Sequence, residues 1–234
     1  MGYTGDVRAG GPADVRELDA LTVRKASVGG MDNNAYLLTC RRTGAQLLVD
    51  AAADADRLLD LVREGSATAR LDTVVTTHRH RDHLGALASV VAVTGALTCA
   101  GADDAHAISV EAGVPVHERL HDGATVTFGD VVLDVIGLRG HTPGSVALAY
   151  REPADARADG AVPGRTHLFT GDSLFPGGPG RTSGGEDFDS LMDDLEERVF
   201  AQFPDDTWVY PGHGNDTTLG VERPHLGEWR ARRW

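Results

Sequence analysis

The feature that most constrains this chain is a short segment in which histidine and aspartate follow an apolar run. Residues 78–83 read His-Arg-His-Arg-Asp-His, so three histidines and one aspartate fall within six residues. They come directly after residues 71–77, a run rich in β-branched side chains that predicts a strand. The alternative is a charged loop that holds histidines by chance, but solvated loops rarely place them this densely.

Three later segments repeat this arrangement. In each, an apolar run that predicts a strand is followed by a glycine and then by a potential ligand: His141, Asp172 and His213. Glycine at these positions allows tight turns and a close approach of the backbone. Because strand ends can meet at one edge of a sheet, we expect these side chains to converge there with residues 78–83.

The combined set of histidines and aspartates predicts a metal centre. Imidazole and carboxylate ligands without a thiolate suit Zn, Fe or Mn. Seven ligands are too many for one open catalytic site with three protein ligands, but they suit two metals about 3.5–4 Å apart that share a carboxylate. The candidate ligands are His78, His80, Asp82, His83, His141, Asp172 and His213.

Apolar runs and turn residues predict a mixed α/β fold. Strands are expected at 21–28, 35–40, 45–50, 71–77, 96–100, 124–128, 131–138, 146–150, 167–170 and 207–210. Helices are expected at 54–64, 83–94, 103–112 and 188–203. Strands alternate with helices but also come in hairpin-like pairs, so neither a doubly wound parallel sheet nor an all-β fold matches. Two mixed sheets with helices packed outside are the expected layers.

Length and local composition predict a single domain. A chain of 234 residues holds one or two domains if a domain takes about 150 residues. Residues 1–20 are polar and glycine-rich, and we expect them to form a flexible arm that precedes one domain over 21–234. Residues 151–165 contain two prolines and two glycines and predict a mobile surface loop within that domain.

Composition excludes several classes of protein. With a net charge of −13, the chain is a poor binder of polyanions, so we expect no nucleic-acid partner. It has neither the run of about 18 apolar residues that spans a membrane nor the apolar segment of a secretory signal. Cys40 and Cys99 lie within apolar runs, which predicts buried free thiols and fits a reducing, cytoplasmic setting.

The order of these residues resembles the metallo-β-lactamase superfamily, and the resemblance spans residues 50–213. It implies a four-layer αββα sandwich of two mixed β-sheets flanked by helices, with the metals at one edge. It also implies that Asp172 bridges two metals and that Asp50, which is not a ligand, supports the site from behind. The implied ligands of the first metal are His78, His80 and His141. The implied ligands of the second metal are Asp82, His83 and His213.

Segments around the ligands look like the glyoxalase II-like branch, whose members hydrolyse hydroxyacyl thioesters. The similar segments are Gly-His-Thr-Pro-Gly-Ser at 140–145, Gly-Asp-Ser-Leu-Phe at 171–175 and Tyr-Pro-Gly-His-Gly at 210–214. Aspartate at 172, where many metallo-β-lactamases carry cysteine, favours a hydrolase with two equivalent metals. The glutathione-specific enzymes carry a further helical domain with basic residues that hold glutathione, whereas few residues follow His213 here. The resemblance therefore leaves the thiol of the substrate open.

The expected reaction is hydrolysis of a small-molecule thioester or ester by a hydroxide that bridges two divalent ions, zinc first, with iron or manganese as alternatives. Asp82 and Asp172 are the predicted catalytic carboxylates, ionised beside the metals. A thiolate leaving group needs little acid assistance, because the pKa of a thiol is about 8.5. Hydrolysis of a lactone or another ester by the same fold is an alternative.

A second reaction class stays open at the level of sequence. The persulfide dioxygenase branch of the family keeps the same residues but binds one iron through two histidines and one aspartate, here His78, His141 and Asp172. The cysteine that this branch often carries in its glycine-rich loop is absent from residues 177–182. A catalytically silent binding module is a third reading, against which the complete ligand set argues.

Phe175 and Arg181 are the predicted substrate-binding residues. Arg181 lies in residues 176–185, a loop with five glycines that follows Asp172 closely in sequence. These glycines would allow the loop to move at the entrance of the site. A plain connecting loop is the alternative.

Overall fold

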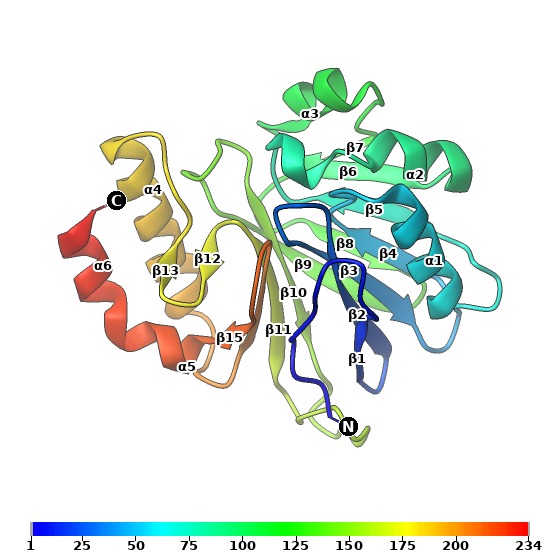
Figure 1. The fold of residues 1–234 in the computed structure, drawn as a ribbon. Helices are drawn as coiled ribbons and strands as arrows, with labels where there is room; N and C mark the ends of the chain where they lie inside the picture. Colours follow the sequence, from blue (N-terminus) through cyan, green and yellow to red (C-terminus); the bar gives the residue numbers. More distant parts are fainter. Residues whose placement is uncertain (1, 234) are drawn as a thin grey trace.

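The computed structural model describes residues 2–233. Met1, the first residue of the expected arm, and Trp234, the last of the expected domain, lie outside the described residues. Within 2–233 the strands form two large mixed sheets that pack face to face, and helices cover the outer side of each sheet (Figure 1). The predicted αββα sandwich is therefore confirmed.

The first sheet begins antiparallel and ends parallel. Its strands follow the order β1 to β7, antiparallel from β1 to β4 and parallel from β4 to β7. Helices connect the parallel strands and lie on the outer face: α1 (Ala55–Gly65), α2 (Leu87–Thr94) and α3 (Ala105–Ala112). The strands are β1 (Asp14–Glu17), β2 (Leu21–Val28), β3 (Asn33–Cys40), β4 (Gln46–Val49), β5 (Thr73–Thr76), β6 (Leu97–Gly101) and β7 (Glu118–Leu120).

The second sheet is antiparallel except for one central pair. Its order is β15-β14-β11-β10-β9-β8, and β11 and β14 run parallel. The strands are β8 (Thr125–Phe128), β9 (Val131–Gly137), β10 (Val146–Arg151), β11 (Thr166–Gly171), β14 (Trp208–Pro211) and β15 (Thr217–Thr218). A small hairpin beside this sheet is formed by β12 (Leu174–Phe175) and β13 (Gly178–Pro179).

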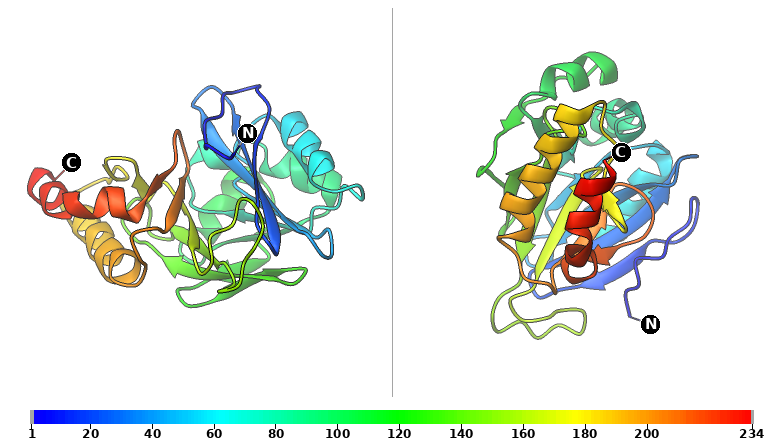
Figure 2. Two further views of the ribbon diagram at one scale, coloured as in Figure 1. Left: turned by 90° about the horizontal axis from the view of Figure 1, so that it is seen from below. Right: turned by 90° about the vertical axis from the view of Figure 1, so that its left-hand side faces the viewer.

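The C-terminal half supplies the helices over the second sheet (Figure 2). Helix α4 (Gly185–Asp194) continues into a π-helical segment, η2 (Leu195–Phe200). Residues after β15 form α5 (Leu219–Glu222), a 3₁₀ turn η3 (Arg223–His225) and α6 (Leu226–Arg232). These last helices were not predicted, because their sequence is polar except at a few positions such as Trp229, which is buried in the hydrophobic cluster shared by the second sheet and its helices.

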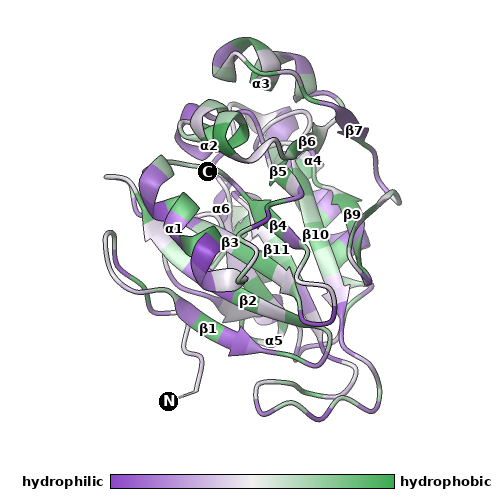
Figure 3. Ribbon diagram, turned by 90° about the vertical axis from the view of Figure 1, so that its right-hand side faces the viewer, coloured by the Kyte–Doolittle hydropathy of each residue, from purple (hydrophilic) through white to green (hydrophobic). Residues whose placement is uncertain are grey.

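Alternation along the strands gives each sheet two apolar faces. In β3, Leu38 packs in the core between the sheets and Leu37 packs in the core under the helices. In β11, Phe169 packs in the core between the sheets and Leu168 packs in the core under the helices of the second sheet. The central strands carry hydrophobic colours in Figure 3, whereas the edge strands β1 and β7 are mostly hydrophilic. Sheets covered on both sides explain why the predicted strands read as nearly continuous apolar runs.

The structure corrects the prediction that residues 1–20 form a flexible arm. Residues 14–17 form β1, which pairs with β2, and Leu18 is fully buried. The Asp14 carboxylate accepts hydrogen bonds from the backbone N–H groups of Thr4 and Gly5, both at 2.8 Å. Strand β1 was missed because an edge strand with one covered face can be short and polar.

The predicted helix at 83–94 begins later than expected. Residues Arg81–His83 form a 3₁₀ turn, η1, and α2 starts only at Leu87. Between them the chain passes close to other backbone: a Cβ at Gly85 would lie 2.8 Å from the carbonyl oxygen of Ala52. This tight passage separates the residues that face the site from the helix that packs on the sheet.

Two further expectations concern membranes and thiols. None of the helices in residues 2–233 combines the length and the apolar character needed to cross a membrane. Cys40 and Cys99 are buried free thiols, as predicted. Burial, together with nearby Glu118, raises the pKa of the Cys99 thiol to about 12.

Candidate metal centre

The seven candidate ligands all lie at one edge of the sandwich. They come from the turn after β5, from the β9–β10 loop and from the turns that follow β11 and β14. Donor atoms within 4.8 Å of one another define three overlapping groups, which are His78, His80 and His141; His78, His83 and Asp172; and Asp82, His83 and His213. The side chains that the sequence pattern singled out therefore lie close together, and their binding of metals stays a prediction.

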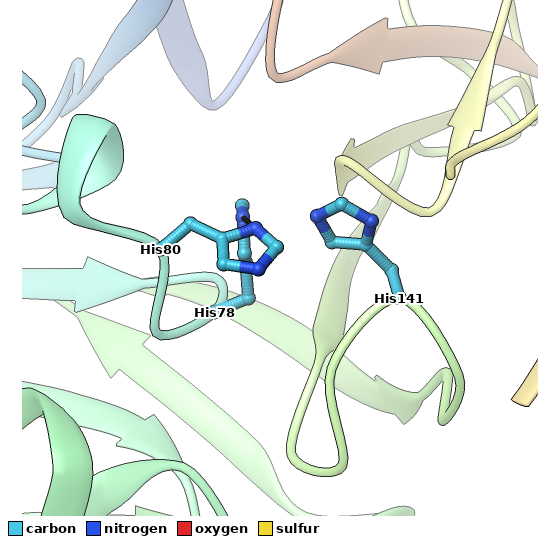
Figure 4. A group of neighbouring side chains, drawn as sticks. All are labelled: His78, His80 and His141. Carbon is cyan, nitrogen blue, oxygen red and sulfur yellow. Dashed lines mark hydrogen bonds between the residues drawn. The ribbon is translucent and has the colours of Figure 1, made fainter. Parts of the chain in front are cut away.

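His78, His80 and His141 form what we call the three-histidine cluster. His78 is buried, His80 is exposed, and His141 approaches them from the β9–β10 loop (Figure 4). The Nε2 atom of His78 lies 3.1 Å from Nδ1 of His80. Two nitrogens bound to one tetrahedral zinc at 2.0–2.1 Å would lie about 3.3 Å apart. The spacing in this cluster therefore fits a single metal ion.

Asp82, His83 and His213 form what we call the aspartate–histidine cluster. His83 Nε2 lies 3.1 Å from His213 Nε2 and 3.4 Å from Asp82 Oδ2. The third distance, from Asp82 Oδ2 to His213 Nε2, is 3.2 Å. These three separations also fit donors that share one tetrahedral metal.

Asp172 lies between the two clusters. Its Oδ1 atom is 3.3 Å from His83 Nε2, and its Oδ2 atom is 3.5 Å from His213 Nε2 and 3.7 Å from His141 Nε2. One carboxylate thus reaches donor atoms of both clusters. This is the position that a ligand shared by two metals requires.

Two buried atoms of the site lack a hydrogen-bond partner among the described residues. They are His141 Nε2 and Asp172 Oδ1. Leaving a buried polar group unsatisfied costs about 1–3 kcal/mol, so such atoms call for an explanation. A divalent cation at this edge would satisfy both, and the residues present therefore fit a metal.

The pKa values differ between the clusters. Burial lowers the pKa of His78 well below its usual value and also lowers that of His141, so both imidazoles are neutral and ready to bind a metal. Burial opposes charge on His83 as well, but the carboxylates of Asp50 and Asp172 outweigh it and raise the pKa of His83 to about 10. Burial also works against ionisation of Asp172, yet the nearby imidazoles of His213 and His83 hold its pKa well below the usual range.

Asp50, predicted to support the site, contacts the His83 ring at Nδ1, the nitrogen that faces away from the cluster. It follows β4, and its Oδ2 atom lies 2.9 Å from His83 Nδ1. The carboxylate also accepts hydrogen bonds from the backbone N–H of Thr77 at 2.7 Å and from its hydroxyl at 2.8 Å. These contacts orient the His83 ring so that Nε2 faces the aspartate–histidine cluster.

Asp104 supports the other cluster and was not predicted. It is fully buried and accepts hydrogen bonds from the backbone N–H groups of Arg79 at 3.1 Å and Gly144 at 3.0 Å, and from the Thr142 hydroxyl. It thereby joins the turn that carries His78 and His80 to the loop that carries His141. The sequence around Asp104 predicts only the beginning of a helix.

Asn33 and a backbone carbonyl were also missed. The Asn33 amide donates a hydrogen bond to Asp82 at 2.9 Å, and His213 Nδ1 lies 2.9 Å from the carbonyl oxygen of Met31. Two asparagines, Asn33 and Asn34, at the start of an otherwise apolar strand were the available signal. The carbonyl contact leaves no signal in the sequence, because any residue supplies that group.

Phe175 and Arg181 both lie beside the metal-ligand candidates. The Phe175 ring centroid is 6.4 Å from that of His213, and the carbonyl oxygen of Arg181 is 2.7 Å from His141 Nδ1. Residues 175–181 line a cavity of about 460 Å³. The structure thus places both predicted residues next to the site, with the Arg181 side chain exposed.

Comparison with known proteins places this architecture in a family. The family model described as the metallo-beta-lactamase superfamily matches residues 28–153. The chain is also 34% identical over 184 residues to the hydroxyacylglutathione hydrolase of Polaromonas sp.. This chain belongs to the metallo-β-lactamase superfamily. Matches at 30–34% identity to several hydroxyacylglutathione hydrolases support the predicted glyoxalase II-like branch.

The extent of these similarities differs among the relatives. The match covers 76% of this chain but 60% of the Polaromonas protein, and the chain spans 60–65% of the length of three such hydrolases. Among solved structures, ETHE1 from Myxococcus xanthus aligns with a TM-score of 0.69 at 27% identity, covering 87% of this chain and 82% of that one. TTHA1623 in a di-iron-bound form aligns with a TM-score of 0.64 at 30% identity, covering 84% and 95%.

Proposed function

We propose that the protein is a metal-dependent hydrolase that uses two divalent ions to cleave the thioester bond of a small acyl thioester. The observation that carries this proposal is the position of Asp172, whose two oxygens lie 3.3–3.7 Å from donor atoms of both clusters. A site built for one metal has no need of a carboxylate between two complete sets of donors. The similarity to hydroxyacylglutathione hydrolases supports the thioester as substrate.

The ligands divide between the two metals as the clusters do. The three-histidine cluster would hold the first metal, the aspartate–histidine cluster the second, and Asp172 would be shared. When bound, two divalent ions lower the pKa of a water molecule toward neutrality and polarise the carbonyl that is attacked. Zinc suits these nitrogen and oxygen donors, and the di-iron form of TTHA1623 supports iron as an alternative.

The chain's own residues prepare the site for this chemistry. The pKa of Asp172 lies well below its usual range and that of Asp82 is also lowered, so both carboxylates are ionised at neutral pH. They supply the negative charge that two cations need and can accept hydrogen bonds from the attacking water. Asp50 holds the His83 ring, so the second cluster keeps its orientation before any metal or substrate arrives.

Phe175 and Arg181 would contact the substrate. Phe175 is half-buried beside His213 and offers an apolar wall to the acyl group or to the chain of the thiol. The exposed guanidinium of Arg181 offers a cation to a carboxylate on the substrate. The cavity between them, about 460 Å³, is large enough for a small acyl thioester.

Hydrolysis of a panel of substrates tests the proposed reaction. Protein loaded with zinc would be assayed for thiol release from hydroxyacyl thioesters of glutathione and of the smaller, uncharged thiol N-acetylcysteamine, alongside a lactone. We expect thiol release from at least one thioester, and its loss after treatment with a chelator. A protein that carries two metals but releases no thiol from any thioester would contradict the proposal.

One observation favours a second candidate function. The structural similarity to ETHE1 fits a persulfide dioxygenase that binds one iron through His78, His141 and Asp172. Oxygen consumption by the iron-loaded protein with a low-molecular-weight persulfide would identify it. A single iron bound in this way would use none of the three donors of the aspartate–histidine cluster, and we therefore favour the hydrolase.

A further inference from the structure

The aspartate–histidine cluster takes its donors from both sheets. Asp82 and His83 follow β5 of the first sheet, whereas His213 follows β14 of the second. The separations of 3.1–3.4 Å within the cluster therefore depend on how firmly the two sheets are joined at this edge. A residue that joins them beside His213 would position the cluster without being one of its donors.

Lys25, the only lysine of the chain, makes such a connection. It lies on β2 directly opposite Tyr36, whose ring packs in the core between the sheets. Its ammonium group donates hydrogen bonds to the carbonyl oxygen of Gly214 and to Asp216 Oδ1, both at 2.7 Å. Both acceptors lie in the loop between β14 and β15, so a cation of the first sheet holds the residue next to His213.

The ion pair of Lys25 and Asp216 is buried and fully bonded. Lys25 has no exposed surface, and its third hydrogen bond goes to the carbonyl oxygen of Gly5 at 2.8 Å, so all three donors of the ammonium group are used. Asp216 Oδ2 accepts hydrogen bonds from the Tyr3 hydroxyl at 2.7 Å and from Trp208 Nε1 at 2.9 Å. Neither side chain can turn away without leaving a buried charge unpaired.

Such a pair is a poor means of stabilising a fold. Taking two charges out of water is costly, and apolar residues of similar volume often stabilise a protein as well or better. What the pair provides is a fixed geometry, because one nitrogen atom ties residues 2–6, β2 and the β14–β15 loop together. We propose that Lys25 is a positioning residue of the second metal site, which keeps His213 at its distance from Asp82 and His83. This inference rests on the proposed two-metal function.

The two clusters are joined across the sheets by different residues. Asp104 connects the turn of His78 and His80 to the loop of His141. The segments that Lys25 ties together carry none of these three histidines. Loss of Lys25 should therefore act on the second metal and spare the first.

Neutral donors of the first sheet share the task with Lys25. The Asn34 side chain donates hydrogen bonds to the carbonyl oxygens of Pro211 and Gly214, both at 2.9 Å, and the Tyr36 hydroxyl donates one to Pro211 at 2.6 Å. The β14–β15 loop should therefore remain attached without the lysine, but less rigidly. We expect metal binding to be weakened rather than abolished.

Zinc titration of a double variant tests the inference. Lys25→Met combined with Asp216→Asn removes both charges together, so no buried ion is left unpaired. Competition with a chromophoric chelator should show the second equivalent bound about 10-fold more weakly and the first as in the parent. The matched control is Gln46→Met, which removes another fully buried polar group, bonded to the carbonyl oxygen of Val62 at 3.1 Å, at the far end of β4 from Asp50. The control should bind both equivalents as the parent does.

Hydrogen exchange of the metal-free proteins adds a readout that does not depend on metal. The amides of residues 212–216 should exchange faster in the double variant than in the parent or in Gln46→Met. Tyr3→Phe removes only one hydroxyl from Asp216, and it keeps the test open if the double variant does not fold. It should weaken the second equivalent about 2–3-fold, in the same direction.

The outcomes separate this inference from the proposed function. Equal weakening of both equivalents would assign Lys25 a merely structural role and overturn the inference. A parent that binds only one equivalent would overturn the two-metal function together with the inference. Two equivalents that neither variant weakens would overturn the inference alone.

Discussion

The two clusters at the edge of the sandwich differ in charge and in the way the fold supports them. The three-histidine cluster holds only imidazoles, and Asp104 supports it indirectly through the backbone of two loops. The aspartate–histidine cluster contains a carboxylate, and Asp50 contacts one of its rings directly. Burial lowers the pKa of His78 in the first cluster, whereas carboxylates raise the pKa of His83 in the second. The first cluster thus contains a neutral His78 and the second a protonated His83, and Asp172 lies between the two clusters.

The largest effect is expected where the clusters meet. Asp172→Ala removes the carboxylate that reaches donors of both. We expect fewer than two metal equivalents per chain and a loss of about a thousandfold in kcat/KM, because several kcal/mol of stabilisation of the reacting charges disappears. Metal analysis and thioester hydrolysis would measure both. The matched control is Asp56→Ala, an exposed aspartate in the first turn of α1, which should change neither quantity. Activity that survived Asp172→Ala would refute the shared-ligand role.

Substitution of Asp50 or Asp104, the carboxylates that support the two clusters, should weaken the binding of one metal and not the other. Asp50→Asn keeps a residue type that tolerates the backbone φ of +59° there but cannot accept all three hydrogen bonds, so we expect the second metal to bind about 10–100-fold more weakly. Asp104→Asn should weaken the first metal instead. Competitive zinc titration of both variants gives the comparison. If each variant weakened both metals equally, the clusters would not be supported independently.

The pH dependence of zinc binding should also distinguish the clusters. Because its pKa is raised to about 10, His83 is protonated in the metal-free protein at pH 6–8, and a metal must displace that proton. Affinity of the second cluster should therefore fall about tenfold for each unit by which the pH decreases from 8. The lowered pKa values of His78 and His141 keep these two imidazoles neutral, so a metal displaces no proton from them, and we expect the affinity of the first cluster to depend less steeply on pH between 7 and 8. Equal slopes in calorimetric titrations would remove this distinction.

A smaller effect is expected at the substrate pocket beside the second cluster. Phe175→Ala removes part of the apolar wall next to His213. We expect KM for a thioester to rise about 3–10-fold, because the side chain is only half-buried, while kcat stays within about twofold. Val93→Ala, an exposed apolar side chain on α2, is the control. A fall in kcat with unchanged KM would place Phe175 in the chemistry rather than in binding.

The candidate ligands and the residues that support them also differ in how well the sequence predicted them. The candidate ligands were recognisable because each lies next to a predicted strand end and belongs to a residue type with a clear chemical preference. Asp104 and Asn33 could not be recognised as supporting residues, because their contacts join segments far apart in the chain. Their local sequence indicates only the start of a helix for Asp104 and the start of a strand for Asn33. The helices after β15 were missed for a related reason. Their few apolar residues, such as Trp229, form a core only together with sheet and helix residues from other parts of the chain.

Stepwise reloading of the metal-free protein tests the central claim most directly. Zinc would be added in fractions of an equivalent while hydrolysis of a responsive hydroxyacyl thioester is followed by thiol release. Two cooperating clusters predict little activity up to one equivalent, a rise between one and two, and a plateau at two. Full activity at one equivalent would contradict the account, because the aspartate–histidine cluster would then be dispensable.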